Sequence, residues 1–233
     1  MSSDISDLEW SVFETTNQLR TNPAYFIEIL SERLQYFDGD IYYAPGSNIG
    51  IRTFEGPAAV EEAIAYLETA RPTHPLEWRT GMAMACTDHV YDTGPLGLTG
   101  HTGSDGSKFT DRLNRYGQWG LSAAENISYG QQTGLDVVMQ LLIDDGVSSR
   151  GHRSNLMNPS SNFSGVASGL HAQYKDMTCV TYAGSYDDDA SIAISGSSTS
   201  NSMTATAEII IEVQAALGQV CDPLEDLMPV PAE

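Results

Sequence analysis

The fold of this chain is decided by two short stretches that each carry one histidine: residues 100–107, GHTGSDGS, and residues 150–159, RGHRSNLMNP. Small residues that favour turns surround both His101 and His152. A third stretch, residues 124–130, AENISYG, lies between them and contributes a glutamate. Imidazole and carboxylate groups that meet in one cavity form either a divalent-metal site or an acid–base site. The three stretches therefore predict a polar functional cleft.

Around these stretches the sequence predicts helices first and strands late. A short sheet that follows several helices indicates an α+β layered domain. Apolar spacing predicts a long helix over residues 7–36 that breaks at Pro23, because proline cannot continue a helix. Turn-forming residues at 38–46 predict an irregular excursion. The other predicted elements are helices over 57–69, 76–93, 109–116 and 136–143, and strands over 164–169 and 177–183.

The composition of the chain changes after Tyr186, which predicts a domain over residues 1–186 and an acidic extension over 187–233. The extension contains nine acidic residues and neither lysine nor arginine. Its Ser/Thr/Gly-rich run at 195–204 is typical of a linker. Residues 205–217 are predicted to form a helix, although their isoleucine run also fits a strand.

The formal net charge of −20 excludes some partners. Nucleic acid and anionic membrane surfaces repel so acidic a protein, whereas cations and neutral lipids do not. No segment approaches the roughly 20 consecutive apolar residues of a membrane span. The first residues, MSSDISD, lack the basic and apolar regions of a signal peptide, so either a cytosolic protein or a processed chain is expected.

The three cysteines, Cys86, Cys179 and Cys221, are too few for a disulfide scaffold. One bridge with one free thiol and three free thiols are both open, and Cys179 could pair with either of the others. Arg112 and Arg153 are expected to form structural ion pairs with the abundant acids.

The three stretches, in this order, closely resemble the CAP superfamily, which comprises the cysteine-rich secretory, antigen 5 and pathogenesis-related 1 proteins and is also called the SCP domain. The resemblance covers about residues 8–186, and its details are similar to microbial and algal members. It implies a three-layer α-β-α sandwich with a short central antiparallel sheet. It also implies a central cleft lined by two histidines and two acids.

Carried over by position, the family's cleft residues are His101, Glu125 and His152. The second acid is assigned to Asp145, with Asp144 as the alternative. The chain departs from the family here, because Leu142 replaces a tryptophan and aspartate is shorter than glutamate. Two histidines and a carboxylate are suitable ligands for a divalent metal, Zn²⁺ first, with Ca²⁺ or Mg²⁺ as alternatives. The other interpretation of the same residues is a polar, hydrogen-bonded cleft without a metal. The acids can bind the ion directly or accept the second ring N–H of a ligating histidine.

The resemblance further implies a binding protein outside the cell, although a cytosolic or organellar location stays open. Its expected ligand is a small apolar molecule, sterol-like or lipid-like, or a partner protein. No catalytic residue is assigned. One alternative is a metal-dependent peptidase or esterase that uses Glu125 or Asp145 as general base. Another is an assembly protein with a vestigial cleft that docks through residues 187–233.

Overall fold

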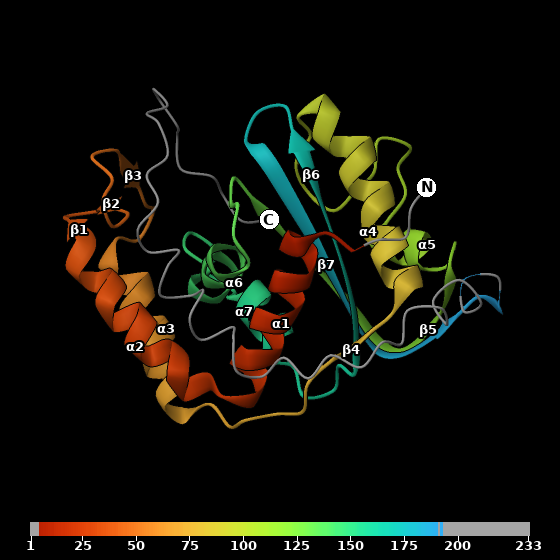
Figure 1. The fold of residues 1–233 in the computed structure, drawn as a ribbon, viewed down its shortest axis with the longest axis horizontal. Helices are drawn as coiled ribbons and strands as arrows, with labels where there is room; N and C mark the ends of the chain where they lie inside the picture. The colour runs from red at the N-terminus through yellow and green to blue at the C-terminus, as the bar shows by residue number, and fades with distance from the viewer. Residues whose placement is uncertain (1–4, 191, 193–233) are drawn as a thin grey trace.

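A computed structural model describes residues 5–190 and 192 (Figure 1). At its centre lies a four-stranded sheet with the strand order β4-β6-β7-β5. Strand β7 pairs antiparallel with both of its neighbours, whereas the short β4 runs parallel to β6. Strand β5 therefore forms one edge of the sheet. The four strands are β4 (Glu77–Trp78), β5 (Gly117–Tyr129), β6 (Phe163–His171) and β7 (Lys175–Asp188).

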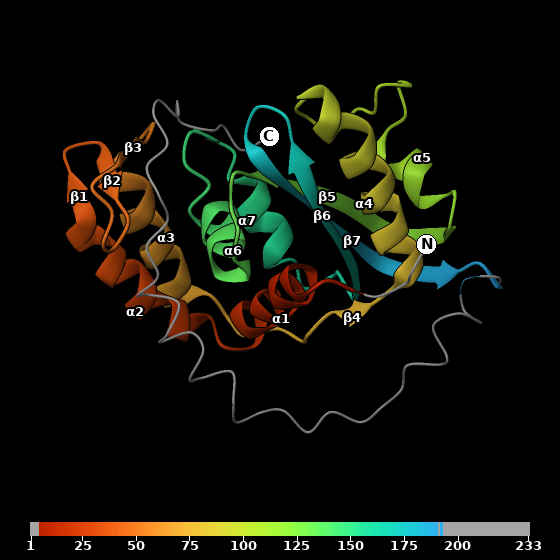
Figure 2. The same ribbon diagram turned by 45° about the horizontal axis from the view of Figure 1, so that its top comes forward.

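Helices cover both faces of this sheet (Figures 1 and 2). One face carries α4 (Thr80–Thr93), with α5 (Phe109–Leu113) beside β5. The other face carries α1 (Asp7–Thr21), α6 (Gly134–Ile143) and α7 (Gly151–Leu156). These three layers confirm the α-β-α architecture and the α+β class.

A smaller unit lies beyond α6, away from the main sheet (Figure 2). Helices α2 (Pro23–Arg33) and α3 (Pro57–Thr69) pack against each other, and α3 also contacts α6. Between them the chain forms a small antiparallel sheet. Its strands are β1 (Phe37–Asp38), β2 (Ile41–Tyr43) and β3 (Gly50–Arg52), and the two short 3-10 helices of the fold are η1 (Leu34–Tyr36) and η2 (Gly94–Leu96).

The first two helices follow from local signals in the sequence. Ser6 caps α1 in a capping box with Glu9, which satisfies two backbone N–H groups that lack helical partners. Helix α1 ends at Thr21 and α2 begins at Pro23, which occupies the first turn, where its missing N–H costs nothing. The predicted break at Pro23 is confirmed.

Two predicted elements are wrong in detail. The helix expected over 76–93 begins only at Thr80, because Glu77 and Trp78 pair with β6. The excursion expected at 38–46 is partly regular, since Ile41–Tyr43 form the middle strand of the small sheet. In both cases the strand forms because it pairs with a segment far along the chain or across a turn. The spacing of apolar residues within one segment does not reveal such a partner.

Each face of the main sheet has its own apolar core. The larger core joins α1, α3 and α6 to the sheet through fully buried side chains such as Leu19, Val138 and Val166. The core under α4 is smaller and includes two buried cysteines among its members: Cys86, Val90, Ile127, Tyr129, Ala167, Met177 and Cys179. Polar site residues next to either core are therefore held by rigid packing.

Within residues 5–190 and 192, no helix is both long and apolar enough to cross a membrane. Strand β7 continues through Asp188, past the boundary predicted at residue 186. The predicted linker at 195–204 and the helix at 205–217 lie outside the described residues.

Candidate functional site

The first histidine of the site is held by a buried carboxylate on the edge strand. His101 Nδ1 lies 2.9 Å from Glu125 Oε1. The His101 side chain is 39% exposed, whereas that of Glu125 is 1% exposed, so the pair runs from the surface into the interior. The loop that carries His101 is fixed at Gly100, whose N–H donates to the Tyr129 hydroxyl and whose carbonyl lies 2.7 Å from His89 Nε2.

A buried arginine holds Glu125 from the opposite side. Arg112, in α5, donates from Nη2 to both Glu125 oxygens at 3.0 and 2.8 Å. It also donates to the backbone carbonyl of His101 at 3.2 Å. The ion pair expected of Arg112 is therefore present, and its partner is the site carboxylate itself.

These contacts set the charge of Glu125. Burial opposes its ionisation, but the hydrogen bond with His101 and the positive charge of Arg112 outweigh burial, so the pKa of Glu125 lies below its ordinary value. Glu125 is thus an ionised carboxylate at neutral pH. A carboxylate that already accepts from two partners is better suited to orienting His101 than to accepting a proton from a substrate.

The second histidine has a similar partner, but from a different element. His152 Nδ1 lies 2.6 Å from Asp144 Oδ1, and its backbone N–H donates to Asp144 Oδ2 at 2.9 Å. Asp144 follows the last residue of α6 in a left-handed conformation, with φ 59°, and is fully buried. That conformation turns its side chain back toward the start of α7, where His152 sits.

Asp145, which the resemblance assigned to the site, has a different set of partners. Its two carboxylate oxygens accept the backbone N–H groups of Phe54 and Glu55, each at 2.8 Å. It therefore fixes the chain that leads into α3. The structure places Asp144, the alternative acid, against His152.

Consecutive residues of β5 connect the two halves of the site. Side chains alternate between the faces of a strand, so Glu125 and Asn126 point to opposite sides of the sheet. Glu125 contacts His101 on the α4 side. Asn126 donates to the backbone carbonyl of His152 at 3.1 Å on the α7 side and accepts from Asn155 at 2.8 Å. Each histidine–acid pair is thus attached to the same edge strand, on its own face.

An ion-pair network fixes the segment before His152. Arg150 bonds to Glu55 and Glu62, with its Nη1 2.6 Å from Glu55 Oε1. Arg153 adds a bond from Nη1 to Glu62 Oε1 at 3.0 Å, so the ion pair expected of Arg153 is confirmed. The hydrogen bond from Arg150 is the largest cause that lowers the pKa of Glu55, to about 2.

The arrangement of the histidines and acids bears on how the site could hold a metal ion. No group of three or more His, Cys, Asp or Glu side chains is arranged to hold a metal within the part of the chain that the structure describes. Both acids instead contact Nδ1 of a histidine. Carboxylates behind the imidazoles are typical of groups that orient ligating histidines rather than ligate themselves. In each pair the acid therefore lies where it can orient the histidine ring through Nδ1.

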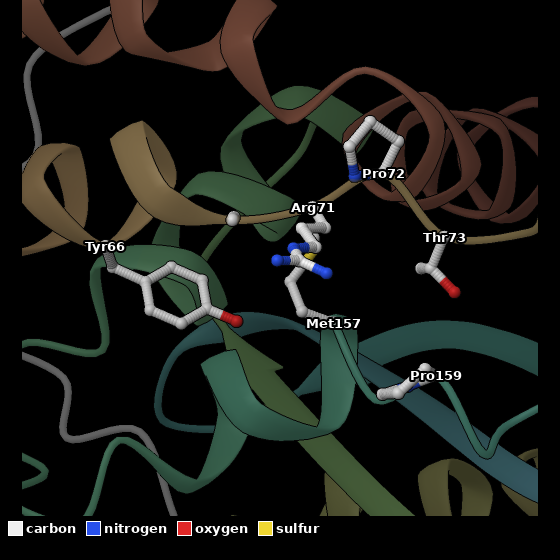
Figure 3. Close-up of a pocket in the computed structure, with 7 residues that line it drawn as sticks. Tyr66, Arg71, Pro72, Thr73, Met157 and Pro159 are labelled. Carbon is white, nitrogen blue, oxygen red and sulfur yellow. The ribbon is translucent and has the colours of Figure 1, made fainter.

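An apolar pocket of about 340 Å³ lies next to the second half of the site (Figure 3). It opens between the end of α3 with the segment after it and the chain that leaves α7. Figure 3 shows Tyr66, Arg71, Pro72 and Thr73, which come from α3 and the segment after it, together with Met157 and Pro159, which follow α7. Met157 directly follows the helix that carries His152. The pocket lining is Tyr66, Ala70, Arg71, Pro72, Thr73, Met157 and Pro159.

Sequence reasoning did not find two of the residues that contact the site. Asn126 lies in the AENISYG stretch, but no role was predicted for it. Its position next to Glu125 on a strand would have placed its side chain on the opposite face of the sheet from Glu125. Cys179, whose Sγ lies 3.3 Å from Glu125 Oε2, carried no local signal, because only the pairing of β5 with β7 brings it there.

The chain is similar to known proteins in both sequence and structure. The family model described as CAP, the cysteine-rich secretory protein family, matches residues 13–182. No curated protein sequence matches the chain significantly.

Similar solved structures include an outer surface protein from Borrelia burgdorferi, with 18% identity and a TM-score of 0.41 over 54% of this chain and 88% of that one. An extracellular protein with an SCP domain from Bacillus anthracis has 20% identity and a TM-score of 0.39 over 56% of this chain and 42% of that one. A cysteine-rich secretory protein from Staphylococcus aureus has 15% identity and a TM-score of 0.35 over 55% of this chain and 37% of that one.

The chain thus spans less than half the length of the last two proteins, and all three likenesses are distant. Family membership rests on the family model, whose match covers most of the chain and all three of the motifs that carry His101, Glu125 and His152. The chain belongs to the CAP, or cysteine-rich secretory protein, family.

Proposed function

We propose that the chain is a binding protein whose two histidine–acid pairs bind a divalent cation, Zn²⁺ first. The observation that carries this proposal is that each histidine meets a buried acid through Nδ1, His101 with Glu125 and His152 with Asp144. A carboxylate at Nδ1 fixes the orientation of an imidazole, as is typical of histidines that bind a metal through the other ring nitrogen. Imidazole nitrogen is a preferred ligand of Zn²⁺.

Calorimetric titration of Zn²⁺ into the full chain tests this proposal. We expect stoichiometric binding that is lost when His101→Ala and His152→Ala are combined. His74→Ala is the matched control, because His74 is exposed and belongs to neither pair. Titrations with Ca²⁺ and Mg²⁺ test the alternative ions. Absence of Zn²⁺ binding in the unaltered chain, or an equal loss in the control, would contradict the proposal.

The roles of the acids favour binding over hydrolysis. Both oxygens of Glu125 accept from Arg112, and both oxygens of Asp144 accept from His152. A general base needs a lone pair that can reach a substrate or a water molecule. Carboxylates committed in this way support a site that holds an ion and a ligand.

The proposed ligand is a small apolar molecule, sterol-like or lipid-like, bound outside the cell as is typical of the family. The apolar pocket beside α7 supports this part of the proposal, because five of its seven lining residues are tyrosine, alanine, proline or methionine. A fluorescent sterol and a fluorescent fatty acid serve as probes. We expect Met157→Glu to abolish their binding and Leu170→Glu, at an exposed site elsewhere, to leave it unchanged. Binding that survives Met157→Glu would remove the pocket from the proposal.

A further inference from the structure

Two cysteines from different layers of the fold meet beneath the site. Cys86 lies in α4 and Cys179 in β7, and their sulfur atoms are 2.8 Å apart. Both side chains are fully buried, and both are thiols in the structure. They are separated by more than ninety residues of sequence, so only the tertiary fold brings them together.

The close approach is fixed by the backbone rather than by flexible side chains. Gly165 in β6 faces α4 so closely that an added Cβ would lie 2.2 Å from the backbone nitrogen of Ala83. This glycine lets the helix lie directly on the sheet. Cys86 sits one turn further along α4, and its Sγ lies 3.6 Å from the Gly165 carbonyl oxygen. The distance between Cys86 and Cys179 is therefore set by packed elements on both sides.

We propose that Cys86 and Cys179 are a disulfide site, oxidised while the chain folds. The sulfur atoms need to approach by only about 0.8 Å to reach the length of a disulfide bond. The oxidant is a disulfide, either of a small thiol such as glutathione or of a thiol–disulfide oxidoreductase. A thiolate of the pair attacks one sulfur of the oxidant, which forms a mixed disulfide and releases the first thiol of the oxidant. The second cysteine then attacks the first cysteine's sulfur, which closes the Cys86–Cys179 bridge and releases the second thiol. Two electrons pass to the oxidant, and both cysteine protons end on the two thiols that it releases.

Burial explains why this step belongs to folding and not to the folded state. Thiol–disulfide exchange needs a thiolate and access of the oxidant to sulfur. Cys179 is fully buried. Burial and the neighbouring Cys86 raise its pKa well above the ordinary value. A pair that folds as thiols therefore stays reduced, and a pair that folds as a disulfide is shielded from reductants.

The bridge would change the surroundings of the site without touching its histidines. The Cys179 thiol donates to Glu125 Oε2 at 3.3 Å, and a disulfide has no proton to donate. Glu125 would keep its contacts with Arg112 and His101. The disulfide proposal does not depend on the metal proposal, because it rests on sulfur positions alone.

The test uses the full chain with Cys221→Ser, which leaves both buried cysteines in place. The chain is denatured and reduced, then refolded either with reduced and oxidised glutathione or with dithiothreitol, and denatured again with an alkylating agent. Cleavage at methionine puts the three cysteine positions on separate fragments, 85–139, 178–203 and 204–228. We expect fragments 85–139 and 178–203 to be joined only after refolding with glutathione. The unaltered chain should give the same link, with Cys221 alkylated.

The thermal midpoint provides a second measurement. A bridge across this long loop should raise Tm by about 10 °C in the glutathione-refolded protein relative to the dithiothreitol-refolded protein. Cys86→Ala combined with Cys221→Ser is the matched control and should show no dependence on the refolding buffer. Complete alkylation of both buried cysteines after refolding with glutathione, or a link to Cys221 in the unaltered chain, would overturn the proposal. Identification of the linked fragments tests the disulfide even if the Cys86→Ala control folds poorly.

Discussion

At the scale of single residues, the neighbours Asp144 and Asp145 accept hydrogen bonds from different parts of the fold. Asp144 is fully buried and accepts from the ring and backbone of His152, whereas Asp145 accepts two backbone N–H groups at the surface. Asp144→Asn should lower the free energy of unfolding by about 3 kcal/mol, because a buried acceptor pair is disrupted. Asp145→Asn should cost about 1 kcal/mol. Urea denaturation measures both, and equal losses would contradict the assignment.

The Asp144→Asn and Asp145→Asn variants also test whether Asp144 acts in the site or only stabilises the fold. If Asp144 orients His152 for an ion, Asp144→Asn should weaken Zn²⁺ affinity by about 10- to 100-fold. Asp145→Asn should leave the affinity unchanged, since its carboxylate accepts from the backbone N–H groups of Phe54 and Glu55. Calorimetry on the two variants makes this comparison, and a weaker affinity in Asp145→Asn alone would favour the original assignment.

The motifs predicted His101, Glu125 and His152 as site residues, and the second acid was assigned to Asp145, with Asp144 as the alternative. The two side chains diverge because Asp144 adopts a left-handed backbone conformation at the end of α6. Such a conformation is uncommon for any residue other than glycine, although aspartate and asparagine tolerate it better than most. The residue types alone therefore do not reveal which carboxylate turns inward.

At the scale of elements, the link between α3 and α7 should respond to acid. The pKa of Glu55 is lowered to about 2, mainly by its hydrogen bond with Arg150. A depressed pKa contributes stability that is present above the unfolded value, near 4.5, and is lost as the pH falls toward 2. Arg150→Ala should therefore flatten the decline of the unfolding free energy between pH 4.5 and 2.

Arg52→Ala is the matched control for this titration. It removes the same charge from a nearby exposed position, and Arg52 forms no ion pair among the residues that the structure describes. Its pH profile should parallel that of the unaltered chain. Chemical denaturation at closely spaced pH values makes the comparison, and parallel profiles for all three proteins would exclude the network as the cause.

Gly165 lies where α4 approaches the backbone of the sheet most closely. An added Cβ at Gly165 would meet backbone atoms of Met82 and Ala83 at 2.5 and 2.2 Å, and backbone atoms cannot rotate away. Gly165→Ala should therefore destabilise the protein by about 3 kcal/mol. Gly151→Ala is the control, because its Cβ would approach nothing closer than 3.4 Å. Thermal denaturation measures both variants, and an equal loss of stability in the two would contradict this explanation.

Most helices were predictable because their apolar spacing and end signals are local, as at Ser6 and Pro23. Strand β5, which holds Glu125, was not predicted. Its first half is a mixture of exposed and half-buried residues with an irregularity between Gly120 and Ala123, and its last five residues are buried in succession. Neither half shows the alternation that reveals a strand. Only its pairing with β7, which lies far along the chain, makes it regular.

At the scale of the whole molecule, one buried arginine joins segments from the beginning, middle and end of the domain. Arg20, in α1, donates to the carbonyls of His74, Leu156, Asn158 and Ser161. Burial lowers its pKa. Arg20→Met would leave several buried carbonyls without donors and should cost about 4 kcal/mol. Arg52→Met, at an exposed site, should change stability by less than about 0.5 kcal/mol.

Urea denaturation of these two variants tests whether the arginine holds the domain together. The sequence gives no indication of this role, because a helical arginine is usually exposed and its four acceptors lie more than fifty residues away. The fold class and the order of the motifs were readable from the sequence. The contacts between distant segments were not, since they exist only after the layers have packed.

The attachment of both histidine–acid pairs to consecutive residues of β5 limits how this protein can change in evolution. Deletion or insertion of one residue in β5, between the irregularity and Tyr129, would shift the strand's register by one residue. The side chains on one side of the change would then point to the opposite face of the sheet. Glu125 would then meet α7, and Asn126 would meet Arg112. The sheet itself could survive, but both pairs would be lost in one step. Single-residue deletions in this strand should therefore abolish the site. A substitution there should affect only the histidine–acid pair on the face to which the changed side chain points.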